Sequence, residues 1–163
     1  MCGTEFSCDF KSIIRFFEIQ ESDYSQEEKG RRIEQILFPN GAPDDKNLGK
    51  ELSIFLAMGE EIKEDNEVKC FDFRIDAGRI FASFMQAYHI DLTKENFHWW
   101  IFLELFLALP EDTIIRKIID IRTKKIDSKM SSKEKIETLR LQEKYSLDKT
   151  KSSADELLGS MFR

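Results

Sequence analysis

FHWWIFLELFLAL, residues 97–109, is apolar on almost every side when it is wound as a helix. Its one charged residue is Glu104, and Pro110 follows directly. A helix that is apolar all round is expected in the interior, between neighbouring helices. Thr93 can cap this helix, and Pro110 is well placed in the first turn of the next one. We therefore predict a central buried helix around which the rest of the chain packs.

Amphipathic patterns on both sides of this run predict further helices. Apolar residues recur at helical spacing in six other segments. These segments span residues 8–19, 25–38, 45–58, 72–88, 110–121 and 131–145. Ser25 with Glu28 and Ser131 with Glu134 have the pattern of a capping box, and Asp72 can cap the helix that it opens. The sequence therefore predicts an all-α fold, a compact bundle of about six to seven helices.

A strand competes with a helix only in the segment 113–121. Its isoleucines, which include Ile114, Ile115 and Ile118, are β-branched and only moderate helix formers. Their spacing follows a period of 3.6 residues rather than 2. A helix is therefore favoured there.

We predict one helical domain over residues 1–145 and a flexible tail over residues 146–163. Within the domain, the acidic loop 60–70 joins the halves 1–59 and 71–145, because it has too little apolar content to pack. The tail is rich in Ser and Lys but contains a small apolar knot, which could form a short helix on a partner. This apolar knot consists of Leu157, Leu158, Met161 and Phe162.

The composition indicates a folded protein that works inside a cell. Of the 163 residues 41% are hydrophobic, and 14 phenylalanines against 3 tyrosines favour buried contacts between helices. The three cysteines are odd in number and form no C-x-x-C pair, so we expect neither a disulfide framework nor a zinc site. No apolar run approaches the roughly 20 residues of a membrane span, and the N-terminus lacks a signal-peptide pattern. We expect a cytosolic protein without membrane contact.

The charge is unevenly distributed along the chain. The net charge is −6, yet residues 122–151 contain ten Lys or Arg against five Asp or Glu, a local net of +5. The remainder therefore carries −11. A basic segment can bind nucleic acid or an acidic partner, but here the basic residues alternate with glutamates at helical spacing, which favours a solvated helix face. An acidic body also repels phosphate, so nucleic acid is disfavoured as a partner.

No combination of residues points to catalysis. His89 and His98 are nine residues apart, without an H-x-x-x-H or H-E-x-x-H pattern, and the sequence places no general base near Cys70. The glycines are isolated and form no phosphate-binding loop. We therefore expect a non-enzymatic protein with no cofactor and no metal site.

Trp99 and Trp100 are the candidates for a binding surface in the folded body. Adjacent residues on a helix point about 100° apart, so the two rings cannot share one face. The core is the favoured place for both, while an exposed one would be an interface anchor, because tryptophan is enriched at binding hot spots. The exposed member of the pair and the apolar knot are the predicted contacts with a protein partner. Truncation after Tyr145 is expected to leave the fold intact and to weaken partner binding.

Several motifs in the second half of the chain form a series. They are FDFRIDA (71–77), IFASF (80–84), YHIDL (88–92), FHWW (97–100), LPEDT (109–113) and IR (121–122). The series resembles the small proteins called bacteriophage gene product fifteen, from tail operons of long-tailed phages of Gram-positive bacteria. The resemblance covers about residues 6–145, and its most specific parts are HWW and LPEDT. Family members usually open with a short strand-like segment that would end at Met1-Cys2-Gly3, so we expect an altered N-terminus here.

This resemblance implies a non-enzymatic role in phage tail assembly, in the host cytoplasm. The family's gene lies just before the tape-measure gene, a position typical of tail assembly chaperones. Such chaperones coat the tape-measure protein and help to recruit tail-tube subunits, so these two proteins are the implied partners, with self-association into a spiral as one way of coating. The alternative is a structural virion component, such as a head–tail connector or a tail-completion protein. A third hypothesis is a nucleic-acid-binding regulator that uses the basic segment 122–151.

Overall fold

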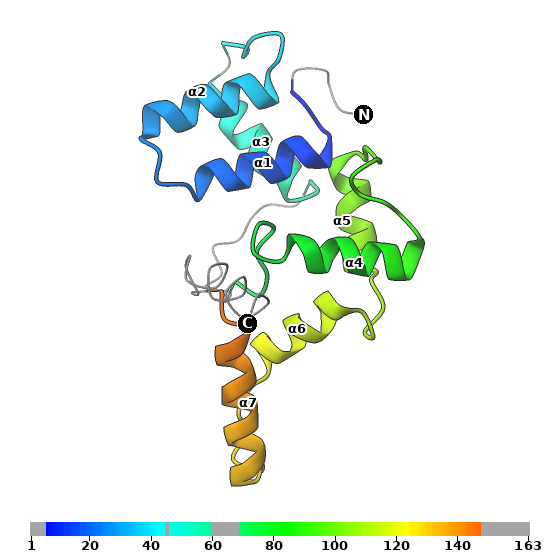
Figure 1. Ribbon diagram of the computed structural model, residues 1–163. Helices are drawn as coiled ribbons and strands as arrows, with labels where there is room; N and C mark the ends of the chain where they lie inside the picture. Colours follow the sequence, from blue (N-terminus) through cyan, green and yellow to red (C-terminus); the bar gives the residue numbers. More distant parts are fainter. Residues whose placement is uncertain (1–5, 45, 60–68, 148–163) are drawn as a thin grey trace, which may run out of the picture.

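The computed structural model describes residues 6–44, 46–59 and 69–147, and these ranges contain seven α-helices and no sheet (Figure 1). The helices are α1 (Phe10–Gln20), α2 (Gln26–Leu37), α3 (Leu48–Leu56), α4 (Ala77–Tyr88), α5 (Trp99–Leu107), α6 (Ile114–Thr123) and α7 (Ser132–Lys144). The predicted all-α fold is therefore confirmed, and the isoleucine-rich segment is a helix. Most of the predicted acidic loop, the apolar knot and nearly all of the predicted tail lie outside the described residues. In the described part, no helix is long and apolar enough to cross a membrane.

The helices are arranged so that the two predicted halves meet at α1 and α5 (Figure 1). α1 packs against α2 and α5, α4 packs against α6, and α6 packs against α7, which extends away from the rest. Two backbone hydrogen bonds join the segments that precede α1 and α5. The Phe10 N–H donates to the Phe97 carbonyl at 2.9 Å, and the Trp99 N–H donates to the Cys8 carbonyl at 2.7 Å. The start of α5 is thus fastened to the start of α1.

Stacked phenylalanine rings form the centre of the core. Phe102 of α5 stacks on Phe10 of α1 with ring centroids 4.8 Å apart, and on Phe84 of α4 with centroids 5.4 Å apart. Ile13 and Leu37 are fully buried in the same core. Burial of one such side chain stabilises the fold by about 1.5–3 kcal/mol. The excess of phenylalanine in the sequence therefore serves the contacts between α1, α4 and α5.

Local capping sets the start of α7 and α2. Ser131 Oγ accepts from the Glu134 N–H at 3.3 Å, and the Glu134 carboxylate accepts from the Ser131 N–H at 2.8 Å, so the predicted capping box is confirmed. At α2 only half of the predicted box forms. Ser25 accepts from the Glu28 N–H, but the Glu28 carboxylate accepts two hydrogen bonds from the Arg32 guanidinium instead.

The predicted start of α5 is wrong. The helix begins at Trp99, and its N-cap is His98, whose Nδ1 accepts from the Trp100 N–H at 3.2 Å. Thr93 lies in an earlier turn, where its N–H and hydroxyl both donate to the Asp91 carboxylate. The side chain of Thr93 is therefore engaged before the helix begins.

The predicted starts of α4 and α6 also differ from the structure. Asp72 accepts from the backbone N–H groups of Arg74 and Ile75 in a turn that precedes α4, so it caps that turn rather than the helix. The Thr113 hydroxyl donates to the Pro110 carbonyl at 2.6 Å, and α6 begins only after Thr113. Pro110 therefore lies in the loop and not in the first helical turn.

Candidate functional site

Trp99 and Trp100 leave α5 in different directions. Trp99 is 2% exposed and lies in the core, whereas Trp100 is 37% exposed, so the favoured core placement holds for Trp99 alone. Both indole N–H groups bind the end of α3. Trp99 Nε1 donates to the Leu56 carbonyl at 3.1 Å, and Trp100 Nε1 donates to the Phe55 carbonyl at 2.7 Å. The pair fastens α3 to α5 through two carbonyls in the last turn of α3, where the regular helical hydrogen bonds end.

α5 is not buried all round, which corrects the expectation from its composition. Ile101 is 53% exposed and Leu107 is 60% exposed, beside the 37% exposed Trp100. At 100° per residue these three side chains share one side of the helix with Glu104 and Ala108, which are also exposed. We call these five residues the α5 outer face. Apolar side chains gathered on an exposed helix face are typical of a protein-binding surface.

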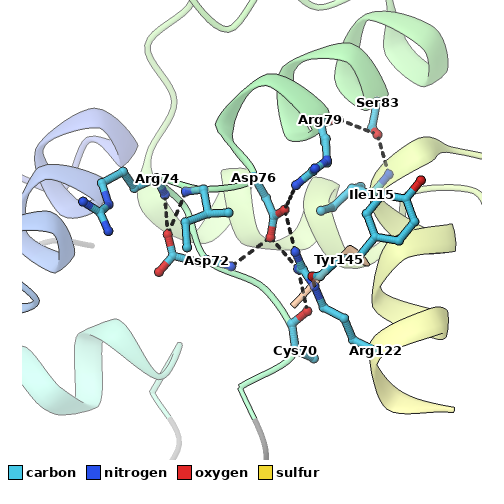
Figure 2. A network of polar contacts seen from close by, with 10 residues as sticks. Cys70, Asp72, Arg74, Asp76, Arg79, Ser83, Ile115, Arg122 and Tyr145 are labelled. Atoms are coloured by element: carbon cyan, nitrogen blue, oxygen red, sulfur yellow. Dashed lines mark hydrogen bonds and ion pairs between the residues drawn. The ribbon is translucent and has the colours of Figure 1, made fainter. Parts of the chain in front are cut away.

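A buried ion pair connects three parts of the second half (Figure 2). The Arg122 guanidinium of α6 donates to the Asp76 carboxylate, through Nη1 at 2.6 Å and Nη2 at 3.0 Å. Arg79 donates to the same carboxylate at 2.6 Å. Arg122 also donates to the Tyr145 carbonyl at 2.6 Å and to the Cys70 carbonyl at 3.1 Å. One arginine thus joins the start of α4, the segment before it and the residue that follows α7.

Asp72 joins this network because its backbone N–H donates to the Asp76 carboxylate at 3.1 Å, and both aspartates have lowered pKa values. Burial by itself would raise the pKa of Asp76, but hydrogen bonds from Arg122 and from the Asp72 N–H outweigh it and lower the pKa. Burial would likewise raise the pKa of Asp72, but hydrogen bonds from Lys69 and the Ile75 N–H lower it to about 2. A carboxyl group held ionised in this way is not poised to exchange a proton near pH 7. We therefore assign the network a structural role.

The chain matches the family model described as Bacteriophage Gp15 protein over residues 3–147. It belongs to this family. The resemblance to bacteriophage gene product fifteen is thereby confirmed, and the match includes all seven helices. It ends before the apolar knot. The chain matches no curated protein and no solved structure.

The histidines of this Gp15 family protein have local structural roles. His98 caps α5, and His89 ends α4 in the left-handed conformation with φ of 56°. No group of three or more His, Cys, Asp or Glu that could hold a metal ion occurs in the described ranges. Cys70 is a free thiol, whereas Cys8 is disulfide-bonded, which the cysteine count did not predict.

The basic segment 122–151 begins with a residue that does not face solvent. The side chain of Arg122 is 7% exposed and neutralised by Asp76. One of the ten positive charges that the nucleic-acid hypothesis requires is therefore committed to the fold. Of the residues predicted to bind a partner, Trp99 and Trp100 have described positions, while Leu157, Leu158, Met161 and Phe162 lie outside the described residues.

Proposed function

We propose that this protein is a non-enzymatic chaperone of phage tail assembly that binds the tape-measure protein through the α5 outer face. Membership of the Gp15 family suggests a protein of phage structure or assembly. The observation that carries the finer proposal is the exposure of Ile101 and Leu107 on a helix that is apolar almost all round. Covering such apolar surface with a partner removes it from water, which favours association through the hydrophobic effect.

An amphipathic helix of a partner fits this surface. Trp100 and Leu107 stand two turns apart on the same side of α5, and a partner helix can pair with them through apolar residues at i, i+3, i+4 and i+7. Trp100 adds a partly exposed aromatic ring of the kind that is enriched at binding hot spots. Glu104 lies between them and favours a basic or polar residue opposite. A long, helical tape-measure protein offers many such helices in succession.

Co-expression with the cognate tape-measure protein tests this proposal. Because the complex would cover apolar surface on both partners, we expect more soluble tape-measure protein and its copurification with this chain. The net charge of −6 also supports the solubility of the complex. Unchanged solubility and recovery of the tape-measure protein would reject the proposal.

Mass spectrometry of purified phage particles separates the chaperone from the alternative of a structural virion component. A chaperone should be missing from the finished particle, whereas a head–tail connector or a tail-completion protein should be present in stoichiometric amount. The nucleic-acid hypothesis has its own test, a DNA mobility shift that weakens steeply with salt.

A further inference from the structure

A second apolar surface lies on a different side of the core from the α5 outer face. It is a cleft of about 420 Å³ between the end of α1, the end of α3, the segment 69–74 and α5. Its apolar lining consists of Phe17, Leu56, Phe71, Phe73, Trp99 and Leu103. The three phenylalanines are only partly buried. A volume of this size is within the range of sites that receive apolar ligands or side chains.

The described chain ends close to this cleft. The Tyr145 carbonyl accepts from Arg122 Nε at 2.6 Å, and Nη1 of the same guanidinium donates to the Cys70 carbonyl at 3.1 Å (Figure 2). Cys70 is itself part of the cleft lining. Arg122 therefore bridges Tyr145, the residue that follows α7, to the cleft wall at Cys70. These two residues are 75 positions apart in the sequence.

The remaining C-terminal residues have the length and the pattern to reach and fill the cleft. Ten residues from Asp148 to Leu157 can span up to about 33 Å when extended. On a helix, the four residues of the apolar knot fall at i, i+1, i+4 and i+5 and share one face. A tethered segment also has an effective concentration in the millimolar range, so modest apolar contacts suffice to hold it.

We propose that residues 154–163 dock in this cleft, with the apolar knot against Phe17, Phe71 and Phe73. The docked segment covers an apolar surface of the free protein, and any partner that uses the cleft has to displace it. The proposal concerns a different surface from the α5 outer face, so it does not rest on the proposed function. It predicts that removal of the segment increases the affinity of cleft-binding partners, whereas a direct partner contact by the knot predicts a decrease.

Disulfide trapping in the full-length chain tests the docking. With Cys2→Ser and Cys8→Ser in place, Cys70 is the one native thiol, and Leu158→Cys puts a second thiol on the apolar face of the segment. Glu156→Cys is the matched control, two residues earlier and on the opposite helix face. During mild oxidation with glutathione disulfide we expect the Leu158→Cys variant to form an intramolecular bond about tenfold faster than the control, because tether length is nearly equal and only docking distinguishes them. Equal rates, or bonds that form only between two copies, would overturn the proposal.

A second measurement keeps the native cysteines. Docking shields the Cys70 thiol, so Leu157→Asp with Phe162→Asp should raise the rate of Cys70 alkylation about threefold or more by releasing the segment. Glu156→Asp with Ser160→Asp is the control, since it alters residues outside the knot, and it should leave the rate unchanged. The modified cysteine is identified by peptide mass. The same alkylation rate in both variants and in the natural protein would contradict docking.

Discussion

At the residue scale, Arg122 holds the second half of the molecule together. Its side chain is 7% exposed, and its guanidinium faces the fully buried side chain of Asp76. The same group satisfies the carbonyls of Cys70 and Tyr145, which come from segments far apart in the chain. Without Arg122, the buried Asp76 carboxylate keeps the ion pair with the more exposed Arg79, and the two carbonyls lose this donor. Breaking a buried ion pair costs about 3–5 kcal/mol.

Replacement of this arginine should therefore destabilise the fold strongly. We expect Arg122→Met to lower the free energy of unfolding by about 3–5 kcal/mol, measured by urea denaturation at neutral pH. Arg79→Met is the matched control, because Arg79 binds the same carboxylate from a side chain that is 35% exposed. Its loss should cost about 1 kcal/mol or less. Equal losses in the two variants would show that Arg122 has no special role.

Asp72 gives the fold a dependence on pH. Its pKa is about 2 in the folded chain against an ordinary 3.8, so folding favours the ionised form. The stability that Asp72 contributes is fully present above its unfolded pKa and is lost as the pH falls from 3.8 toward 2. Between these values we expect Asp72→Asn to lose stability less steeply than the natural protein, measured by thermal unfolding at each pH. Asp23→Asn, at an exposed position, is the control and should follow the natural protein.

At the element scale, the two tryptophans make different contributions to the contact between α3 and α5. The Phe55 carbonyl accepts from the Met58 N–H as well as from the Trp100 indole, and Trp100 is partly open to water. The Trp99 indole is buried and donates to the Leu56 carbonyl. The hydrogen bond of Trp99 should therefore be the harder one to replace.

Tryptophan-to-phenylalanine variants test this difference. We expect Trp99→Phe to lower the free energy of unfolding by about 1–3 kcal/mol, the cost of leaving a partly buried carbonyl without its donor. Trp100→Phe should cost clearly less, since Met58 and water still serve the other carbonyl. Chemical denaturation of the two variants measures both values. A larger loss for Trp100→Phe would contradict this account of the α3–α5 contact.

The sequence predicts helices well where the determining signal is local. The period of 3.6 identifies α6 in spite of its isoleucines, and the reciprocal contact of Ser131 with Glu134 starts α7 as predicted. Prediction from the sequence fails where a contact is made with a residue far away in the chain. Arg122 and Asp76 are 46 residues apart, so no local pattern shows their pairing. The cap of α5 was missed because histidine is not among the preferred N-cap residues.

The sequence of α5 also does not show which side of the helix is exposed. Neighbouring helices cover the side that carries Trp99, Phe102 and Phe106, and they leave Ile101 and Leu107 open. Because both sides are apolar, the hydrophobic pattern does not distinguish them, and a fully buried helix was the natural prediction. The α5 outer face becomes visible only when the surrounding helices are placed.

At the scale of the whole molecule, the fold combines a firmly packed core with apolar surface left open on α5. The core stacks rings from α1, α4 and α5, and the network of Arg122 adds α6 and the residue after α7. These contacts fix the position of α5 from the side opposite its outer face. A rigid helix face of this kind can bind a partner without reorganising, which lowers the cost of association.

The affinity for the cognate tape-measure protein tests the central claim most directly. The change is Ile101→Ser with Leu107→Ser, and the control is Ile136→Ser with Leu139→Ser on α7, whose side chains are 67% and 53% exposed. Calorimetric titration at one salt concentration compares both variants with the natural protein. We predict that the α5 variant binds at least about tenfold more weakly, because it would lose apolar contacts of the proposed interface, while the α7 control binds normally. Equal affinity of all three proteins would contradict the account.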